Sequence, residues 1–98
     1  MQKELTIVIS AYNKELYLDR CIGSLLSSSL DRLEIILVND GSSDRTSEIA
    51  HAYESQHPDS IVVVDKANGD QGSCINVGLK LFRGRYFKTL DADDYLDT

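Results

Sequence analysis

Four short apolar runs divide this chain of 98 residues, and each run is followed by a polar segment. The runs cover residues 5–10, 33–38, 61–64 and 86–90, and Ile, Val and Leu dominate the first three. Continuous apolar runs of this length are typical of strands that are buried on both faces of a sheet. Between them, apolar side chains recur every three or four residues, as on the inner face of a helix. The sequence therefore predicts strands that alternate with helices.

The expected helices cover residues 15–28, 45–57 and 73–82. Asp44 can cap the second helix, because aspartate is a preferred N-cap residue, and Pro58 ends that helix. Strands that are joined through helices by short connections pair in parallel, with right-handed crossovers. We therefore expect an α/β fold with an open, mainly parallel sheet and helices on its faces.

Composition excludes several classes of protein. The length favours a single domain, residues 1–98, and the hydrophobic content of 42% is typical of a globular protein. The net charge of −6 argues against a nucleic-acid partner, which requires a basic surface. No apolar run approaches the roughly 18 residues of a transmembrane segment, and the start of the chain does not resemble a signal peptide. We expect a cytoplasmic location, which for a longer form of the protein includes the inner face of the membrane.

The polar segments after the four strands are the candidate functional segments. In chain order they are SAYNK, NDGSSD, KANGDQG and DADD. The carboxyl ends of parallel strands meet at one edge of the sheet, and open α/β sheets bind their ligands there. His51 and His57, by contrast, are six residues apart on one helix, a spacing that does not put both on one face for metal binding. We interpret these histidines as surface residues.

Asp91 and Asp93 suggest a cation site. Residues two apart in extended backbone point to the same side, so both carboxylates can reach one position. Two carboxylates about 4 Å apart repel by about 4 kcal/mol at an effective dielectric constant near 20. A divalent metal ion, Mg²⁺ or Mn²⁺, would offset this repulsion, because such ions prefer oxygen ligands. The alternative is that Asp93 or Asp94 caps a helix, but the position at a strand end favours the metal.

Asp40 and Tyr12 are the other candidates at the strand ends. Asp40 could accept a hydrogen bond from a nucleotide base or a ribose, although a pure turn role fits equally well. Tyr12 could stack on a planar base or simply pack over the strand ends. The patterns G-x-G-x-x-G and G-x-x-x-x-G-K-[ST] do not occur, so the standard dinucleotide and P-loop fingerprints are absent.

Taken in order, these segments resemble the amino-terminal half of a family 2 glycosyltransferase with the GT-A fold. The matching segments are TIVISAYNKELYLDRCIGSLL, LEIILVNDGSSDRTSEIA and NGDQGSCINVGLKLFRGRYFKTLDADD. Each motif is short, but their order and spacing over residues 5–97 make the resemblance specific. The resemblance implies that this chain is the Rossmann-like, nucleotide-binding half of the enzyme. The acceptor-binding half is then absent, and the chain is a fragment of a longer enzyme.

The resemblance implies inverting, metal-dependent transfer of a sugar from a nucleoside-diphosphate sugar to a hydroxyl of a glycan or lipid-linked acceptor. It also suggests a role in cell-surface polysaccharide biosynthesis. The nucleotide-sugar-binding positions of the family fall here on Ser10, Tyr12, Asn13, Asp40, Asp91 and Asp93. By the same resemblance, Asp91 and Asp93 would hold the divalent metal. The general base is expected beyond Thr98, so no catalytic residue is assigned within the chain and residues 1–98 alone would be inactive.

Three positions depart from the family pattern. Ser10 replaces a usual proline, Asn39 replaces the first of two aspartates, and Ile75 stands where an arginine is common. The missing arginine could alter the affinity for the donor or the choice of donor. A D-x-D-x-T phosphatase is a poor alternative, because Tyr95 occupies the position of the threonine. The second possibility is a nucleotide-binding or regulatory module without turnover.

Overall fold

The computed structural model describes residues 5–26, 33–67, 71–81 and 86–91 of the chain. Strands and helices alternate along these ranges, as predicted. The elements are β1 (Leu5–Ala11), α1 (Leu18–Leu26), β2 (Leu33–Asp40), α2 (Thr46–Gln56), β3 (Ile61–Lys66), α3 (Gln71–Leu81) and β4 (Tyr86–Asp91). None of the described helices has the length and apolar character needed to cross a membrane.

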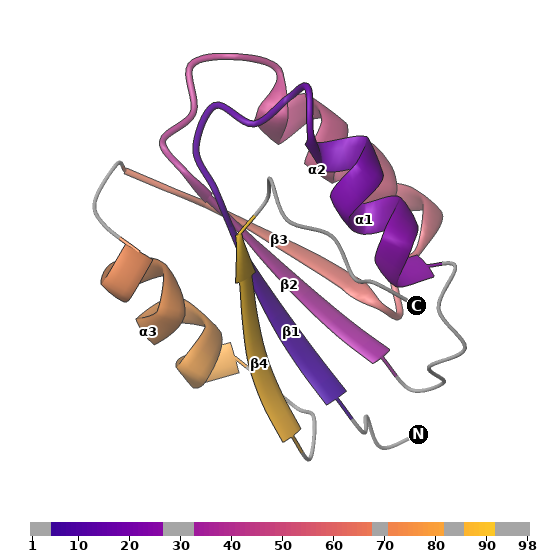
Figure 1. Ribbon diagram of the computed structural model, residues 1–98, viewed down its shortest axis with the longest axis vertical. Helices are drawn as coiled ribbons and strands as arrows, with labels where there is room; N and C mark the ends of the chain where they lie inside the picture. The colour runs from indigo at the N-terminus through magenta and orange to yellow at the C-terminus, as the bar shows by residue number, and fades with distance from the viewer. Residues whose placement is uncertain (1–4, 27–32, 68–70, 82–85, 92–98) are drawn as a thin grey trace.

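The four strands form one sheet in the order β3-β2-β1-β4, and all neighbouring pairs are parallel (Figure 1). The chain proceeds outward from β1 through β2 to β3, and then crosses to the other side of β1 to form β4. The strand order therefore reverses between β1 and β4, which is where open α/β sheets bind ligands. The predicted fold class, an open parallel sheet with flanking helices, is confirmed.

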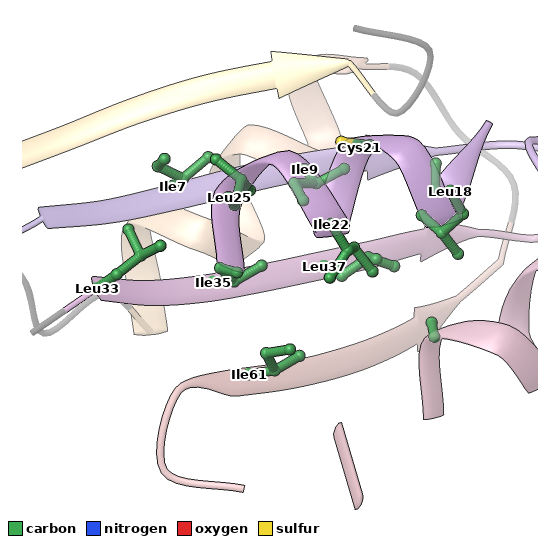
Figure 2. Close-up of a cluster of buried hydrophobic side chains, with 12 residues drawn as sticks. Ile7, Ile9, Leu18, Cys21, Ile22, Leu25, Leu33, Ile35, Leu37 and Ile61 are labelled. Atoms are coloured by element: carbon green, nitrogen blue, oxygen red, sulfur yellow. The ribbon is translucent and has the colours of Figure 1, made fainter. Parts of the chain in front are cut away.

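Helices cover both faces of the sheet: α1 and α2 lie on one face and α3 on the other (Figure 1). The larger core lies under α1 and α2, where odd-numbered residues of β1 and β2 contact α1 (Figure 2). On the opposite face Val8, Ile36 and Val38 are buried, with Val77 of α3 packed against them. Successive residues of a strand point to opposite faces, so strands covered on both sides need apolar residues at every position. This explains the mainly apolar runs. The buried polar residues Thr6 and Glu34 hydrogen-bond to each other at 2.9 Å, Thr6 Oγ1 donating to Glu34 Oε1.

Every strand extends one or two residues beyond its predicted end, into the polar segment that follows. The register pairs Ala11 with Asn39, and Asp40 with Lys66, so the polar residues Asn39, Asp40 and Lys66 still belong to the sheet. The end of an apolar run is therefore not the end of the strand, because backbone pairing does not depend on side-chain polarity.

Two predicted helix boundaries were wrong. Helix α1 begins at Leu18 rather than residue 15, because the preceding residues form a turn in which the N–H groups of Tyr17 and Leu18 both donate to the Lys14 carbonyl. Helix α3 begins at Gln71, so Gly72 lies in a helix rather than in the predicted loop.

Candidate functional site

The carboxyl ends of the four strands meet at one edge of the sheet. In the register, Ser10 of β1 pairs with Val38 of β2 on one side and with Asp91 of β4 on the other. Asp40 lies two residues beyond Val38. The fold thus brings the strand ends that carry Ser10, Asp40 and Asp91 together, as expected. The backbone of Asp91 is described but its side chain is not, and Asp93 lies outside the described residues.

Asp40 is largely buried at the end of β2, with a relative exposure of 7%. Its Oδ1 accepts a hydrogen bond from Nζ of Lys66, the paired residue on β3, at 2.7 Å. The Lys66 ammonium also donates to the carbonyl of Ala67 at 2.7 Å. Lys66 is the first residue of the candidate segment KANGDQG, but it was not singled out, because β3 was expected to end at residue 64. The pairing register of β2 and β3 is the signal that identifies it.

A set of hydrogen bonds joins the loop after β1 to the loop after β2. The N–H of Asn13 donates to Ser42 Oγ at 2.9 Å, and the N–H of Ser43 donates to Asn13 Oδ1 at 2.8 Å. The N–H of Lys14 donates to Thr46 Oγ1, also at 2.9 Å. Asn13 has a φ of 52°, a left-handed conformation that asparagine tolerates better than most residues. Asn13 therefore holds the two loops together.

Tyr12 lies next to this junction and is exposed, with a relative exposure of 49%. In the loop after β2, Gly41 has a φ of 73°, as the expected turn requires. The chain can therefore turn sharply after Asp40 without a steric penalty. An exposed aromatic ring and a buried carboxylate thus lie at the carboxyl ends of adjacent strands.

Asp44 fixes the start of α2, although Arg45 occupies the N-cap position itself. Asp44 Oδ1 accepts the backbone N–H of Thr46 at 2.9 Å, and its Oδ2 accepts the N–H of Glu15 at 3.3 Å. Desolvation tends to raise the pKa of Asp44, but the hydrogen bonds from Thr46 and Glu15 outweigh it and lower the pKa. Asp44 thus bonds the first residue of α2 from one position before the N-cap, so the predicted N-cap assignment is off by one residue.

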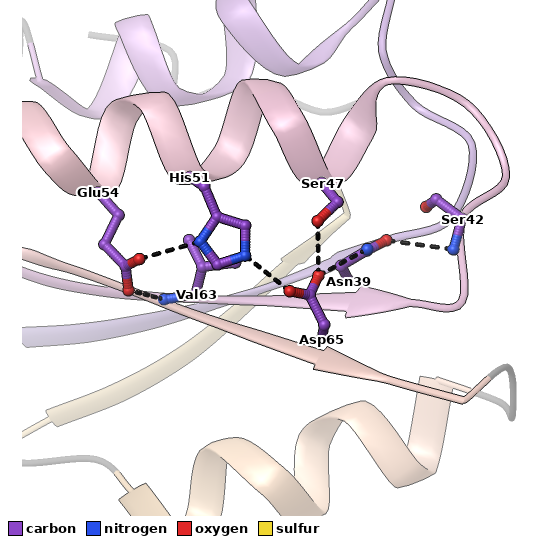
Figure 3. A network of polar contacts seen from close by, with 7 residues as sticks. All are labelled: Asn39, Ser42, Ser47, His51, Glu54, Val63 and Asp65. Carbon is purple, nitrogen blue, oxygen red and sulfur yellow. Dashed lines mark hydrogen bonds and ion pairs between the residues drawn. The ribbon is translucent and has the colours of Figure 1, made fainter.

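A second polar network connects α2 to the ends of β2 and β3 (Figure 3). The ring of His51 lies between Asp65 Oδ2, at 2.6 Å, and Glu54 Oε1, at 3.0 Å. Asp65 Oδ1 accepts from Asn39 Nδ2 at 2.8 Å and from Ser47 Oγ at 2.9 Å. His51 is partly exposed, as a surface residue would be, but the sequence did not indicate these contacts.

The network shifts the pKa values of its members. Hydrogen bonds to Asp65 and then Glu54 raise the pKa of His51, because both carboxylates favour the protonated ring. The pKa of Asp65 is lowered, chiefly by His51 and then by Asn39. The pKa of Glu54 is lowered chiefly by the hydrogen bond from the Val63 N–H and less strongly by His51. Desolvation acts in the opposite direction but does not outweigh them. Among the side chains that the structure describes, no group of three or more acidic, histidine or cysteine residues is arranged to hold a metal ion.

A family model, Glycosyl transferase family 2, matches residues 6–98. The chain belongs to this family. The predicted resemblance is thereby confirmed. EpsJ of Bacillus subtilis strain 168, an uncharacterized glycosyltransferase, is 43% identical over 96% of this chain, which spans 27% of EpsJ. The minor teichoic acid biosynthesis protein GgaB of the same organism is 38% identical over 93% of this chain and 10% of its own length.

Solved structures show the same fold. TarS of S. aureus (residues 1–349) in complex with UDP-GlcNAc has a TM-score of 0.85 at 28% identity, and the match covers 94% of this chain and 27% of that solved chain. The mannosyltransferase PcManGT of Pyrobaculum calidifontis, in complex with GDP-Man and Mn²⁺, has a TM-score of 0.89 at 19% identity. The match covers all of this chain and 30% of the PcManGT chain. The chain thus spans about a quarter of the length of these structural neighbours.

Proposed function

We propose that this chain forms the donor half-site of an inverting, metal-dependent glycosyltransferase, which moves a sugar from a nucleoside diphosphate to an acceptor hydroxyl. The observation that carries the proposal is the meeting of Ser10, Asp40 and Asp91 at the edge where the strand order reverses. The family match over residues 6–98 supports it. So does the likeness to TarS, which has been solved with UDP and with UDP-GlcNAc.

In this proposal the end of β2 and the loop after β1 bind the base. The Tyr12 ring, which is exposed, stacks on the base, and the Asp40 carboxylate accepts a hydrogen bond from a ring N–H. Ser10 and Asn13 complete the pocket. Because Asn13 Oδ1 already accepts the N–H of Ser43, the main contribution of Asn13 is to hold Tyr12 near Asp40.

Asp91 and Asp93 are proposed to hold the ribose and a divalent metal, Mg²⁺ or Mn²⁺. Asp91 ends β4 beside Ser10, and a donor set of two carboxylates fits a hard cation that keeps part of its water shell. When bound, such an ion stabilises the negative charge that develops on the diphosphate leaving group. The base that deprotonates the acceptor is assigned outside residues 1–98.

The acceptor is proposed to be a glycan or a lipid-linked molecule in the assembly of a cell-surface polysaccharide. The relative GgaB is a minor teichoic acid biosynthesis protein, which supports this class of acceptor.

Isothermal titration of the chain with UDP, GDP, CDP and dTDP, with and without Mn²⁺, tests the proposal. We expect metal-dependent binding of at least one nucleotide, which Asp93→Ala abolishes and Asp40→Ala weakens by about tenfold or more. Asp59→Ala is the matched control, because Asp59 is an exposed carboxylate that precedes β3, at the opposite edge of the sheet. If none of the four nucleotides binds at millimolar concentration with metal present, the proposal is wrong.

A further inference from the structure

Lys66 contacts Asp40, the carboxylate that binds the nucleotide base in the proposed function. None of the family motifs identified in the sequence pointed to Lys66. We propose that Lys66 is a positioning residue for donor recognition: its ammonium compensates the charge of Asp40 and holds that carboxylate ready for a ring N–H of the base. The inference rests on the proposed function and adds to it a residue that acts through Asp40.

The geometry of the pair is set by the sheet. Asp40 and Lys66 are register partners on β2 and β3, so both side chains leave the sheet on the same side. That side is the face covered by α3, because it is also the side of Ile36 and Val38. The lysine stem therefore needs to cross only the spacing between two neighbouring strands to reach Asp40.

The contact is short and poorly solvated. Lys66 Nζ lies 2.7 Å from Asp40 Oδ1, and the two side chains are only 20% and 10% exposed, respectively. Charge-assisted hydrogen bonds of this length are about twice as strong as neutral ones. Nζ also donates to the Ala67 carbonyl at 2.7 Å, so the ammonium is held from a second direction. An anchored ammonium restricts the rotamer of Asp40 before any ligand binds.

Charge balance gives the pair its function. An uncompensated carboxylate at this depth is costly to bury, and loss of one partner of a buried pair leaves the other unpaired. The site must also accept a diphosphate, whose negative charge would add to that of Asp40 and Asp91. With Lys66 in place, the Asp40 carboxylate can stay buried and still accept a hydrogen bond from a neutral donor on the base.

The opposite face of the same two strands provides a comparison. One position earlier, Asn39 pairs with Asp65, and the cationic form of His51 can neutralise Asp65 from α2. The sheet therefore carries two charge-compensated pairs, one on each face, and only the Asp40 pair includes a residue assigned to the ligand. His51→Gln is consequently a matched control. It removes the cationic partner of Asp65, a β3 residue whose side chain lies on the face of the sheet opposite α3.

The test measures UDP and GDP binding, with Mn²⁺, to the wild-type chain and to Lys66→Met, Lys66→Arg, Asp40→Asn and the double variant Lys66→Met/Asp40→Asn. Uridine and guanosine are titrated in parallel by NMR. We expect Lys66→Met to weaken binding by about tenfold or more. The loss of affinity should be the same factor for a nucleoside diphosphate as for the corresponding nucleoside. Lys66→Arg should retain most of the affinity, and His51→Gln all of it. In the Asp40→Asn background, Lys66→Met should cause no further loss.

Several results would overturn the inference. Unchanged affinity in a folded Lys66→Met variant would do so, as would additive losses in the double variant. A loss confined to the diphosphates would mean that Lys66 contacts the phosphates directly and does not act through Asp40. Melting curves of each variant separate these results from unfolding, and the double variant removes both charges if Lys66→Met alone fails to fold. The failure of the proposed function is a different result: the wild-type chain would then bind none of UDP, GDP, CDP and dTDP, whereas unchanged affinity in a folded Lys66→Met variant overturns this inference alone.

Discussion

At the scale of single residues, side chains at the ends of β2 and β3 pair across the strands according to the face they occupy. Asp40 bonds Lys66 on the face of α3, and Asn39 bonds Asp65 on the face of α2. Asn39 departs from the two aspartates that are common in the family, and here an amide suits the position because it can donate to Asp65. An aspartate at residue 39 would place two carboxylates against each other.

The network around His51 makes stability depend on pH. Because the pKa of His51 is raised in the folded state, its contribution to stability is complete below about pH 6.5, the unfolded value, and is lost as pH rises through the folded pKa. We therefore expect His51→Gln to lower the free energy of unfolding more at about pH 5.5 than at about pH 9. Urea unfolding followed by circular dichroism at both pH values measures this difference.

Ser47→Ala is the control within the same network. It removes the hydrogen bond that the uncharged Ser47 hydroxyl donates to Asp65 Oδ1, and it leaves both ionic contacts of His51 in place. Its effect on the free energy of unfolding should be the same at both pH values. An effect of His51→Gln that is equal at low and high pH would contradict the assigned protonation.

At the scale of elements, the close packing of α3 on β1 depends on a glycine. A Cβ atom on Gly78 would lie 2.3 Å from Cγ2 and 2.9 Å from Cγ1 of Val8, whose side chain is fully buried. Neither atom can move away without displacing other core atoms. The position of α3 against the sheet is therefore incompatible with any larger residue at 78.

We expect Gly78→Ala to destabilise the fold by about 1–3 kcal/mol, as overpacking of a core usually does. The matched control is Gly23→Ala on α1, where an added Cβ meets nothing within 4 Å. Alanine is the better helix former, so Gly23→Ala should stabilise the chain by about 0.5–1 kcal/mol. Urea denaturation of both variants provides the comparison, and opposite signs are expected. A stabilising Gly78→Ala would show that α3 can shift outward freely.

At the scale of the whole molecule, the candidate site exists only when the sheet is assembled. Ser10, Asp40 and Asp91 come from three strands that are far apart in the chain, so the unfolded chain cannot present them together. A ligand of this site therefore binds the folded state alone and stabilises it by mass action.

UDP with Mn²⁺, or whichever of the titrated nucleotides binds, should raise the melting temperature of the chain. At about 100 times its Kd, a ligand contributes about 2.7 kcal/mol, which corresponds to about 10 °C or more for a domain of this size. Thermal unfolding followed by circular dichroism measures the shift. The shift should shrink in Asp40→Ala and stay unchanged in Asp59→Ala. An equal shift in all three proteins would point to binding away from the strand ends.

Much of the candidate site could be predicted because it depends on local patterns. Apolar runs and helical spacing predicted every element, and the segments after the strands predicted where Ser10, Asp40 and Asp91 would meet. Lys66 and His51 could not be predicted in the same way. Their partners lie 26 and 14 residues away in sequence, respectively. The register of β3 against β2 brings Lys66 to Asp40, and the packing of α2 against β3 brings His51 to Asp65.

The order of residues along the chain is enough to predict the alternation of strands and helices, the parallel sheet that this alternation implies, and the family. Three features are visible only in the tertiary structure: the strand order, the placement of α1 and α2 on one face of the sheet and α3 on the other, and the pairing of Asp40 with Lys66. These features depend on which strands are neighbours and on the face of the sheet to which each side chain points. A pairing register is a relation between distant segments, and a shift of one residue would exchange the two faces.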